Sequence, residues 1–135
     1  GDGRCFIRAI VHQSELDSIE FQGQLYSRPK GRDTWVDSSP EMLLFLWIVT
    51  YKCSETALLV LEGQEHRRHQ TWHRRFANPI NQSQSQLSES LWAREELLKG
   101  VAAELECQIL VQVRSPASEG DVPRVFGRDD AVLFQ

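Results

Sequence analysis

The order of apolar and polar residues predicts helices in most of the chain and strands near its end. Residues 5–12 hold closely spaced apolar side chains, dense enough for a buried helix. Residues 38–41, Ser-Ser-Pro-Glu, offer a capping hydroxyl, a proline suited to the first turn and an acid near the positive helix end. The helix that follows, through residues 42–49 to about Lys52, is apolar on every face and should lie in the core.

Four segments with weaker patterns come before and after this core helix. We interpret residues 14–37 as one short helical piece followed by a loop, because turn-forming residues recur there. Residues 54–62 resemble another short helix, and a glycine follows that should stop it. Residues 64–76 are polar and basic and are compatible with a helix, whereas residues 78–90 are rich in Asn, Gln and Ser and predict an exposed loop.

The last third of the chain has the clearest amphipathic helix, over residues 91–106, followed by strands. Its apolar stripe comprises Leu91, Leu98, Val101, Ala102 and Leu105. Residues 108–113 alternate as a strand does, and residues 122–126 and 131–134 predict two further short strands. Because the helices precede most of the strands, the pattern favours an α+β fold over a doubly wound sheet.

Composition places the chain among soluble globular domains. Its 135 residues suit one domain, with 41% hydrophobic and 25% charged residues. The net charge of -4 gives no general sign of nucleic-acid or membrane binding, and the longest apolar run is shorter than the roughly 18 residues that cross a bilayer. Three widely spaced cysteines argue against a disulfide framework and a zinc site, so we expect a reducing compartment, no metal and no cofactor.

Asp2-Gly3-Arg4-Cys5-Phe6 is the stretch with the most specific chemistry. A cysteine nucleophile reacts as its thiolate, and the free amides and dipole at a helix start favour that negative charge at Cys5. The amides of Gly3, Arg4 and Cys5 lie in the same turn, where they can face a developing oxyanion. The alternative is a cysteine that serves only as a small buried hydrophobe, which is how we interpret Cys53 and Cys107.

At these residues the chain resembles the OTU (ovarian-tumour) family of cysteine proteases and deubiquitinases. The run from Asp2 to Cys5 is similar to the family signature Asp-Gly-Asn-Cys, and Arg8-Ala9 continues the likeness. A second block is similar to the family's tryptophan, helix and strand segment, and its residues are Trp92, Leu98, Gly100, Ala102, Leu105, Ile109 and Val111. Residues 14–86 match the family only in outline.

The resemblance implies an OTU-type variant of the papain-like fold, with a small central sheet flanked by helices. It implies that Cys5 attacks the carbonyl after the C-terminal glycine of ubiquitin or a ubiquitin-like modifier, and that an acyl-enzyme is then hydrolysed. The backbone of Gly3 and Arg4 would form the oxyanion hole. Asp2 would shape that loop and, in some members, it or a late Asp or Asn orients the histidine. We expect a monomer in the cytoplasm or nucleus, with no membrane and no nucleic-acid partner.

The chain departs from the family pattern at two places. Arg4 replaces the usual Asn, and we expect its side chain to project from the loop and to add a positive charge near the thiolate. Trp92-Ala93-Arg94 replaces the common Trp-Gly-Gly or Trp-Gly-Asp, which indicates a divergent member.

The general base is missing from the expected position. His12 is seven residues after Cys5, about 10 Å along a helix, and the other three histidines, at positions 66, 69 and 73, precede the strands instead of following them. The family places its histidine after the last core strand, so we expect a single domain over residues 1–135 that is truncated at both ends, with the base beyond Gln135. Two alternatives stay open: the last residues, 132–135, come from a tag linker, or the protein is an inactive homologue.

Residues 66–75 form a basic segment with four arginines and no acid. On a helix its histidines would share one face, which suggests a metal site, an acidic-partner surface or an RNA contact in which Trp72 stacks. The simpler interpretation is a solvated face with Trp72 packed inward. For the whole chain, the alternatives to a deubiquitinase are a non-catalytic ubiquitin-binding module and a viral or selfish-element polyprotein protease of the same fold.

Overall fold

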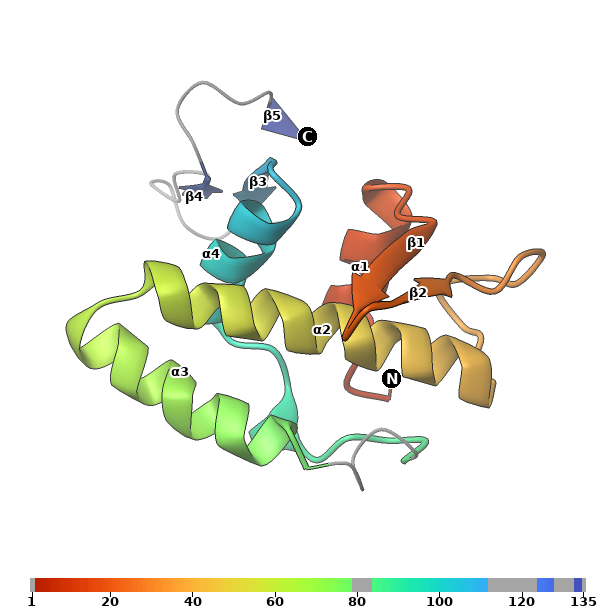
Figure 1. The fold of residues 1–135 in the computed structure, drawn as a ribbon, viewed down its shortest axis with the longest axis horizontal. Helices are drawn as coiled ribbons and strands as arrows, with labels where there is room; N and C mark the ends of the chain where they lie inside the picture. The colour runs from red at the N-terminus through yellow and green to blue at the C-terminus, as the bar shows by residue number, and fades with distance from the viewer. Residues whose placement is uncertain (1, 79–83, 112–123, 128–132, 135) are drawn as a thin grey trace, which may run out of the picture.

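The computed structural model describes residues 2–78, 84–111, 124–127 and 133–134 (Figure 1). A long helix, α2 (Pro40–Val60), crosses the middle of the molecule, with α1 (Cys5–Gln13), α3 (Gly63–Phe76) and α4 (Glu95–Glu104) packed around it. Helices and two small sheets together confirm the expected mixed architecture of helix and strand. Among the described elements it is α2, and not a sheet, that occupies the centre.

The start of α2 follows from its sequence as predicted. Ser39 is the N-cap, and its Oγ accepts a hydrogen bond from the Met42 amide at 3.3 Å while Pro40 takes the first turn. The length and apolar composition of α2 would also suit a membrane span. Half of that stretch is nevertheless buried within the protein, as the core helix of a globular domain would be.

The predicted break near Lys52 is wrong, because α2 continues through residues 53–60 as a single helix. Cys53 and Ser54 stay helical and are fully buried, Cys53 in the hydrophobic core and Ser54 against α3. The turn to α3 comes only at residues 61–63, where Gly63 has φ +58°, a conformation that glycine adopts without strain. The helix that residues 64–76 allowed is confirmed as α3.

The segment from residue 14 to residue 37 differs from its prediction. It holds a hairpin of β1 (Ser18–Phe21) and β2 (Gln24–Ser27) where a helical piece was expected. Gln22 and Gly23, with φ 51° and 76°, form the two-residue turn that joins antiparallel strands. The strands are short and mostly exposed on one side, so their alternation was too weak to recognise in the sequence.

The predicted helix over residues 91–106 is shorter in the structure. A single 3-10 turn, η2 (Glu89–Leu91), comes first, residues 92–94 are extended, and α4 begins only at Glu95. Of the expected apolar stripe, Leu91, Leu98, Val101 and Ala102 are buried as predicted, and Leu105 caps the helix end half-buried.

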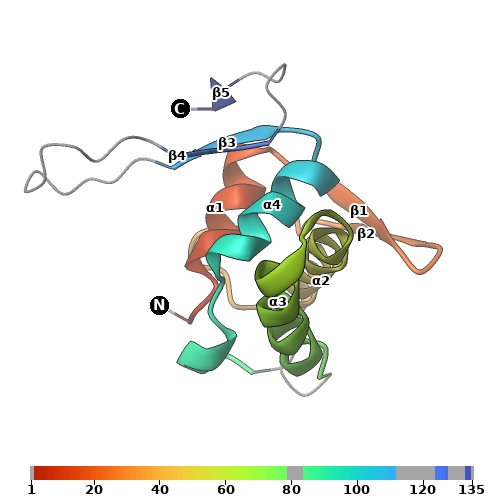
Figure 2. The same ribbon diagram turned by 90° about the vertical axis from the view of Figure 1, so that its left-hand side faces the viewer.

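The second sheet contains β3 (Gln108–Val111), β4 (Arg124–Phe126) and β5 (Leu133–Phe134) in the order β4-β3-β5. The pair β3–β4 is antiparallel and the pair β3–β5 is parallel. All three predicted strands therefore exist, and the remaining parts of the predicted strand ranges lie outside the described residues. Figure 2 shows α1 and α4 side by side below this sheet.

Helices α2 and α4 touch most closely at Gly100. A Cβ built there would lie 2.1 Å from the carbonyl oxygen of Cys53 and 2.6 Å from the Cβ of Ala57. Backbone atoms of a core helix cannot move aside for it, so only glycine allows this spacing. The apolar residues on both sides of the contact, among them Leu97 and Val101, are fully buried.

Gly100→Ala should therefore lower the free energy of unfolding by about 2–3 kcal/mol, although alanine favours a helix by about 1 kcal/mol. Urea denaturation measures the change. Ala103→Leu adds more volume on the same helix at an exposed position and is the control, for which we expect little effect. Equal stability of Gly100→Ala and the natural protein would mean that the two helices do not pack this tightly.

Candidate functional site

Cys5 is the first residue of α1, and it is exposed. Its thiol is therefore not the small buried hydrophobe of the alternative interpretation. The residue before it, Arg4, is the N-cap but provides no side-chain cap, so the amides of the first turn are not covered by a capping group. An accessible thiol at the amide end of a helix is the arrangement that a nucleophilic cysteine needs.

The carboxylate of Asp2 organises the turn that leads into α1. Its Oδ1 accepts the Arg4 amide at 3.0 Å, and its Oδ2 accepts Nη2 of Arg8 at 2.6 Å. Burial opposes ionisation, but the hydrogen bonds from Arg8 and Arg4 and the charges of both guanidinium groups together lower the pKa of Asp2. Both oxygens are engaged within the loop, so Asp2 acts here as a shaping residue.

Arg8 connects this turn to the start of α2. Its buried guanidinium donates to the carbonyl oxygens of Thr34 and Asp37 at 2.8 and 2.7 Å and also pairs with Asp2. The Asp37 carboxylate in turn accepts from the amide and hydroxyl of Ser39, the N-cap of α2. A chain of charged and polar contacts therefore joins the Cys5 loop to the central helix.

The expectation that Arg4 projects from the loop is wrong. Its side chain is only 5% exposed and folds back, and Nη2 and Nη1 donate to the carbonyl oxygens of Gln84 and Ser85 at 2.6 and 3.3 Å. The backbone beside it continues the contact, because the Leu87 amide donates to the Asp2 carbonyl at 2.8 Å. Arg4 thus fastens the Cys5 loop to residues 84–87 and does not extend toward solvent.

The Arg4 amide was predicted to be one of two oxyanion donors, but in this structure it donates to Asp2. Within the described part of the chain, the Gly3 and Cys5 amides make no hydrogen bond to another described residue. Among the described residues, the Gly3 and Cys5 amides are thus left for another acceptor, whereas the Arg4 amide is engaged. The sequence could not reveal this exchange, because it depends on the conformation of the Asp2 side chain.

Trp92 and the Cys5 loop, the two blocks that carry the resemblance, meet in space. A Cβ at Gly3 would lie 2.5 Å from Nε1 of Trp92, and the backbone of Gly3 has φ +84°. The indole donates to the Leu87 carbonyl at 3.3 Å, which orients its ring across the loop. Only glycine has both the room and the conformation for this position, so residue 3 and residue 92 depend on each other.

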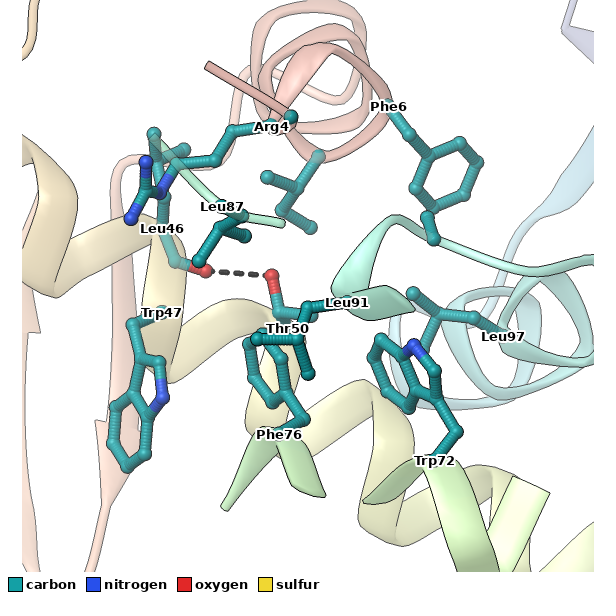
Figure 3. Close-up of a pocket in the computed structure, with 13 residues that line it drawn as sticks. Arg4, Phe6, Leu46, Trp47, Thr50, Trp72, Phe76, Leu87, Leu91 and Leu97 are labelled. Carbon is teal, nitrogen blue, oxygen red and sulfur yellow. Dashed lines mark hydrogen bonds between the residues drawn. The ribbon is translucent and has the colours of Figure 1, made fainter. Parts of the chain in front are cut away.

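Below the loop is a small cavity that Figure 3 shows in close-up. Its volume is about 20 Å³, room for about one water molecule, and mostly apolar side chains from several elements surround it. Among them are Phe6 of α1, Trp72 of α3 and Leu97 of α4. The cavity is too small for a substrate, so a substrate could approach Cys5 only from the exposed side of its loop.

The histidines lie elsewhere. His12 is exposed and contacts Trp35, with ring centroids 5.0 Å apart and ring planes tilted by 49°. His69 and His73 face α2 and share the hydroxyl of Ser54, at 2.9 Å from Nε2 and 2.6 Å from Nδ1 respectively. Among the described residues, no hydrogen bond joins Cys5 to any of the four histidines.

The Ser54 contacts assign hydrogens to both rings. Nε2 of His69 also lies 3.0 Å from the Ser54 carbonyl, which only accepts, so this nitrogen carries the hydrogen. The Ser54 hydroxyl then donates to Nδ1 of His73. The Nδ1 of His69 is buried without a hydrogen-bond partner among the described residues, and burial is the main cause that lowers the pKa of both histidines. A buried serine in this pair is structural and not a reachable nucleophile.

The two other cysteines, Cys53 and Cys107, are both more buried than Cys5. Cys53 is fully buried, which raises its pKa to about 12, and Cys107 is half-buried with a raised pKa. Trp72 is packed inward and its indole donates to the Trp92 carbonyl at 3.2 Å, so it is not a stacking platform. Within the described ranges, no group of three or more His, Cys, Asp or Glu side chains is arranged to hold a metal.

Comparison with protein-family models, with curated proteins and with solved structures finds no match to this chain. The OTU resemblance therefore depends on the sequence motifs alone.

Loss of the Asp2 carboxylate should destabilise the protein strongly. Asp2→Ala leaves Arg8, which is 4% exposed, without its counter-ion, and we expect a loss of about 3 kcal/mol in the free energy of unfolding. Asp17→Ala removes an Asp–Arg pair in which the acid is 81% exposed and should cost less than about 1 kcal/mol. Similar losses in the two variants would show that the Asp2–Arg8 pair does not hold the loop.

The neutral histidines should make stability depend on pH. The pKa of His69 and His73 is lower in the folded protein than the ordinary 6.5, so the unfolded chain binds protons first as the pH falls. Their contribution is complete above about pH 6.5 and declines below it. Urea midpoints on both sides of that pH measure the effect. His69→Gln with His73→Gln should flatten the dependence, and His12→Gln, at an exposed site, should leave it intact.

Proposed function

We propose that this chain is the nucleophile-bearing part of an OTU-type cysteine protease. The supporting observation is the contact of the two blocks that carry the resemblance: Trp92 lies against Gly3, two residues before an exposed Cys5 at a helix start. Their contact makes a shaped loop beside an accessible thiol, which is what nucleophilic attack on a carbonyl needs.

In the proposed reaction, the Cys5 thiolate attacks the carbonyl carbon of the glycine at the scissile bond. The tetrahedral oxyanion is held by the Gly3 and Cys5 amides, since the Arg4 amide is committed to Asp2. A histidine, which has taken the thiol proton of Cys5, gives that proton to the leaving amine as the carbon–nitrogen bond breaks, and a thioester remains on Cys5. Water, deprotonated by the same histidine, then hydrolyses the thioester and frees the thiol.

The proposal assigns that histidine to a residue after the third strand of the sheet, beyond Gln135. The side chains of His69 and His73 are engaged with Ser54, and the ring of His12 contacts Trp35. The proposed substrate is ubiquitin or a ubiquitin-like modifier, cut after its C-terminal glycine, as the resemblance implies. The proposed setting is the cytoplasm or nucleus, where a free thiol such as Cys5 stays reduced, and the proposed state is a monomer.

A ubiquitin probe with a C-terminal electrophile tests the proposal. We expect a covalent adduct at Cys5, seen by mass spectrometry, with this chain or with its natural extension past Gln135. Cys5→Ala should abolish the adduct, whereas Cys107→Ala, which removes a half-buried thiol, should retain it.

Three other results would each contradict part of the proposal. Binding of ubiquitin by the extended protein without an adduct would indicate a non-catalytic ubiquitin-binding module. Failure of the extended protein to bind or react would reject the substrate class. Hydrolysis of a fluorogenic ubiquitin substrate by residues 1–135 alone would place the base among the internal histidines.

A further inference from the structure

One side of α3, together with Arg94 just before α4, carries a concentration of positive charge, and two acids, Glu95 and Glu96, follow in the first turn of α4. The arginine face comprises Arg67, Arg68, Arg74, Arg75 and Arg94, five of the 15 Lys and Arg residues of the chain. The first four lie on one side of α3 by helical spacing, opposite the buried His69. The protein has a net charge of -4, so the charge is distributed very unevenly.

Two of these arginines have no counter-ion among the described residues. Arg67 and Arg74 are exposed and form no ion pair, whereas Arg68 binds Glu96 at 2.8 Å, the charge of Arg94 also acts on Glu96, and Arg75 has an interaction of its own. Exposed unpaired cations that stand close together repel one another, which costs folding energy. This repulsion lowers the stability of the protein, and a bound partner of opposite charge would offset it.

The arginine face borders a groove. Arg68, Thr71 and Arg75 of α3 line one side, Ser90 and Arg94 line the other, and Trp72 forms the floor, enclosing about 290 Å³. Figure 1 shows the teal segment that precedes α4 beside the C-terminal half of α3. The bond from the Trp72 indole to the Trp92 carbonyl joins the two sides, so the groove is preformed.

We propose that the arginine face and its groove bind an acidic segment of a protein partner. Guanidinium groups bind carboxylates in pairs of parallel hydrogen bonds, and the hydroxyls of Thr71 and Ser90 add further polar groups at the same groove. Arg67 and Arg74 lie two turns apart on α3, about 10 Å, so a segment with several carboxylates along its length fits better than a single anion.

Carboxylates are favoured over nucleic acid by two observations. The aromatic residue of this face, Trp72, is 3% exposed and stacks on Phe76, with centroids 4.9 Å apart, so it offers no ring to a base. The net charge of -4 also means that the rest of the protein repels a long polyanion. A short acidic segment meets only the arginine face.

This inference is independent of the proposed function, because it uses neither Cys5 nor ubiquitin. It can be tested on residues 1–135 themselves, because binding of a peptide needs no catalytic histidine. A fluorescein-labelled peptide of alternating Glu and Gly is the probe, with the matching Gln and Gly peptide and a labelled oligothymidylate for comparison. Fluorescence anisotropy at several salt concentrations gives the dissociation constants.

We expect the acidic peptide to bind, more tightly at lower salt, and Arg67→Glu with Arg74→Glu to weaken it about tenfold or more. Lys30→Glu with Arg32→Glu is the matched control, because these two cations are also exposed and form no ion pair among the described residues. This pair should change the dissociation constant by less than about threefold. Thermal melting of each variant checks folding. If the double variant with Arg67→Glu and Arg74→Glu does not fold, the double variant with Arg67→Gln and Arg74→Gln takes its place.

Three outcomes would overturn the proposal. The first is no binding of the acidic peptide at low salt, and the second is an equal loss of affinity in the two charge-reversal pairs, which would show attraction to any surface cation. The third is tighter binding of the oligothymidylate than of the acidic peptide, which would assign the arginine face to nucleic acid.

Discussion

The ion pair between Asp2 and the buried guanidinium of Arg8 is the interaction on which the candidate site depends. A buried cation is stable only when its donors are satisfied, and Arg8 finds partners at Asp2, Thr34 and Asp37. These partners lie on the Cys5 loop and on the approach to α2. Satisfying one charge therefore fixes the start of α1 relative to the central helix, and with it the place where the thiol of Cys5 is presented.

A second set of contacts fixes the other side of the loop. Arg4 donates to carbonyl oxygens of residues 84–85, and Trp92 lies over Gly3. Arg4 stands where the OTU signature that the loop resembles has Asn, and its long side chain reaches residues 84–85 and holds the turn there. These contacts also matter for the chemistry of the loop. They hold the side of the loop that faces the protein, and the opposite side, with Cys5, stays accessible.

Helix α3 shows how one element can have two unrelated sides. Toward α2, Ser54 binds two histidines that burial keeps neutral, and this side stabilises the core. Away from α2, Arg67 and Arg74 are exposed and form no ion pair among the described residues, whereas Arg68 binds Glu96. In the sequence, the histidines and arginines of α3 alternate within ten positions. The sequence therefore left three functions open for this segment: metal binding, stacking on nucleic acid and binding of a partner. The burial of Trp72 and His69 separates the structural side from the side that is available to a partner.

The sequence by itself determined the local features: the Ser39 cap and apolar length of α2, the start of α1 at Cys5, the buried side of α4 and the existence of the last strands. Such features depend on neighbours within a turn or two, where spacing and residue type suffice. Tertiary structure alone decided where the Arg4 side chain points and which amides of the loop stay available. The first depends on the contact of Arg4 with Gln84, 80 positions away in the chain, and the second on one rotamer of the Asp2 carboxylate, so no local pattern encodes either.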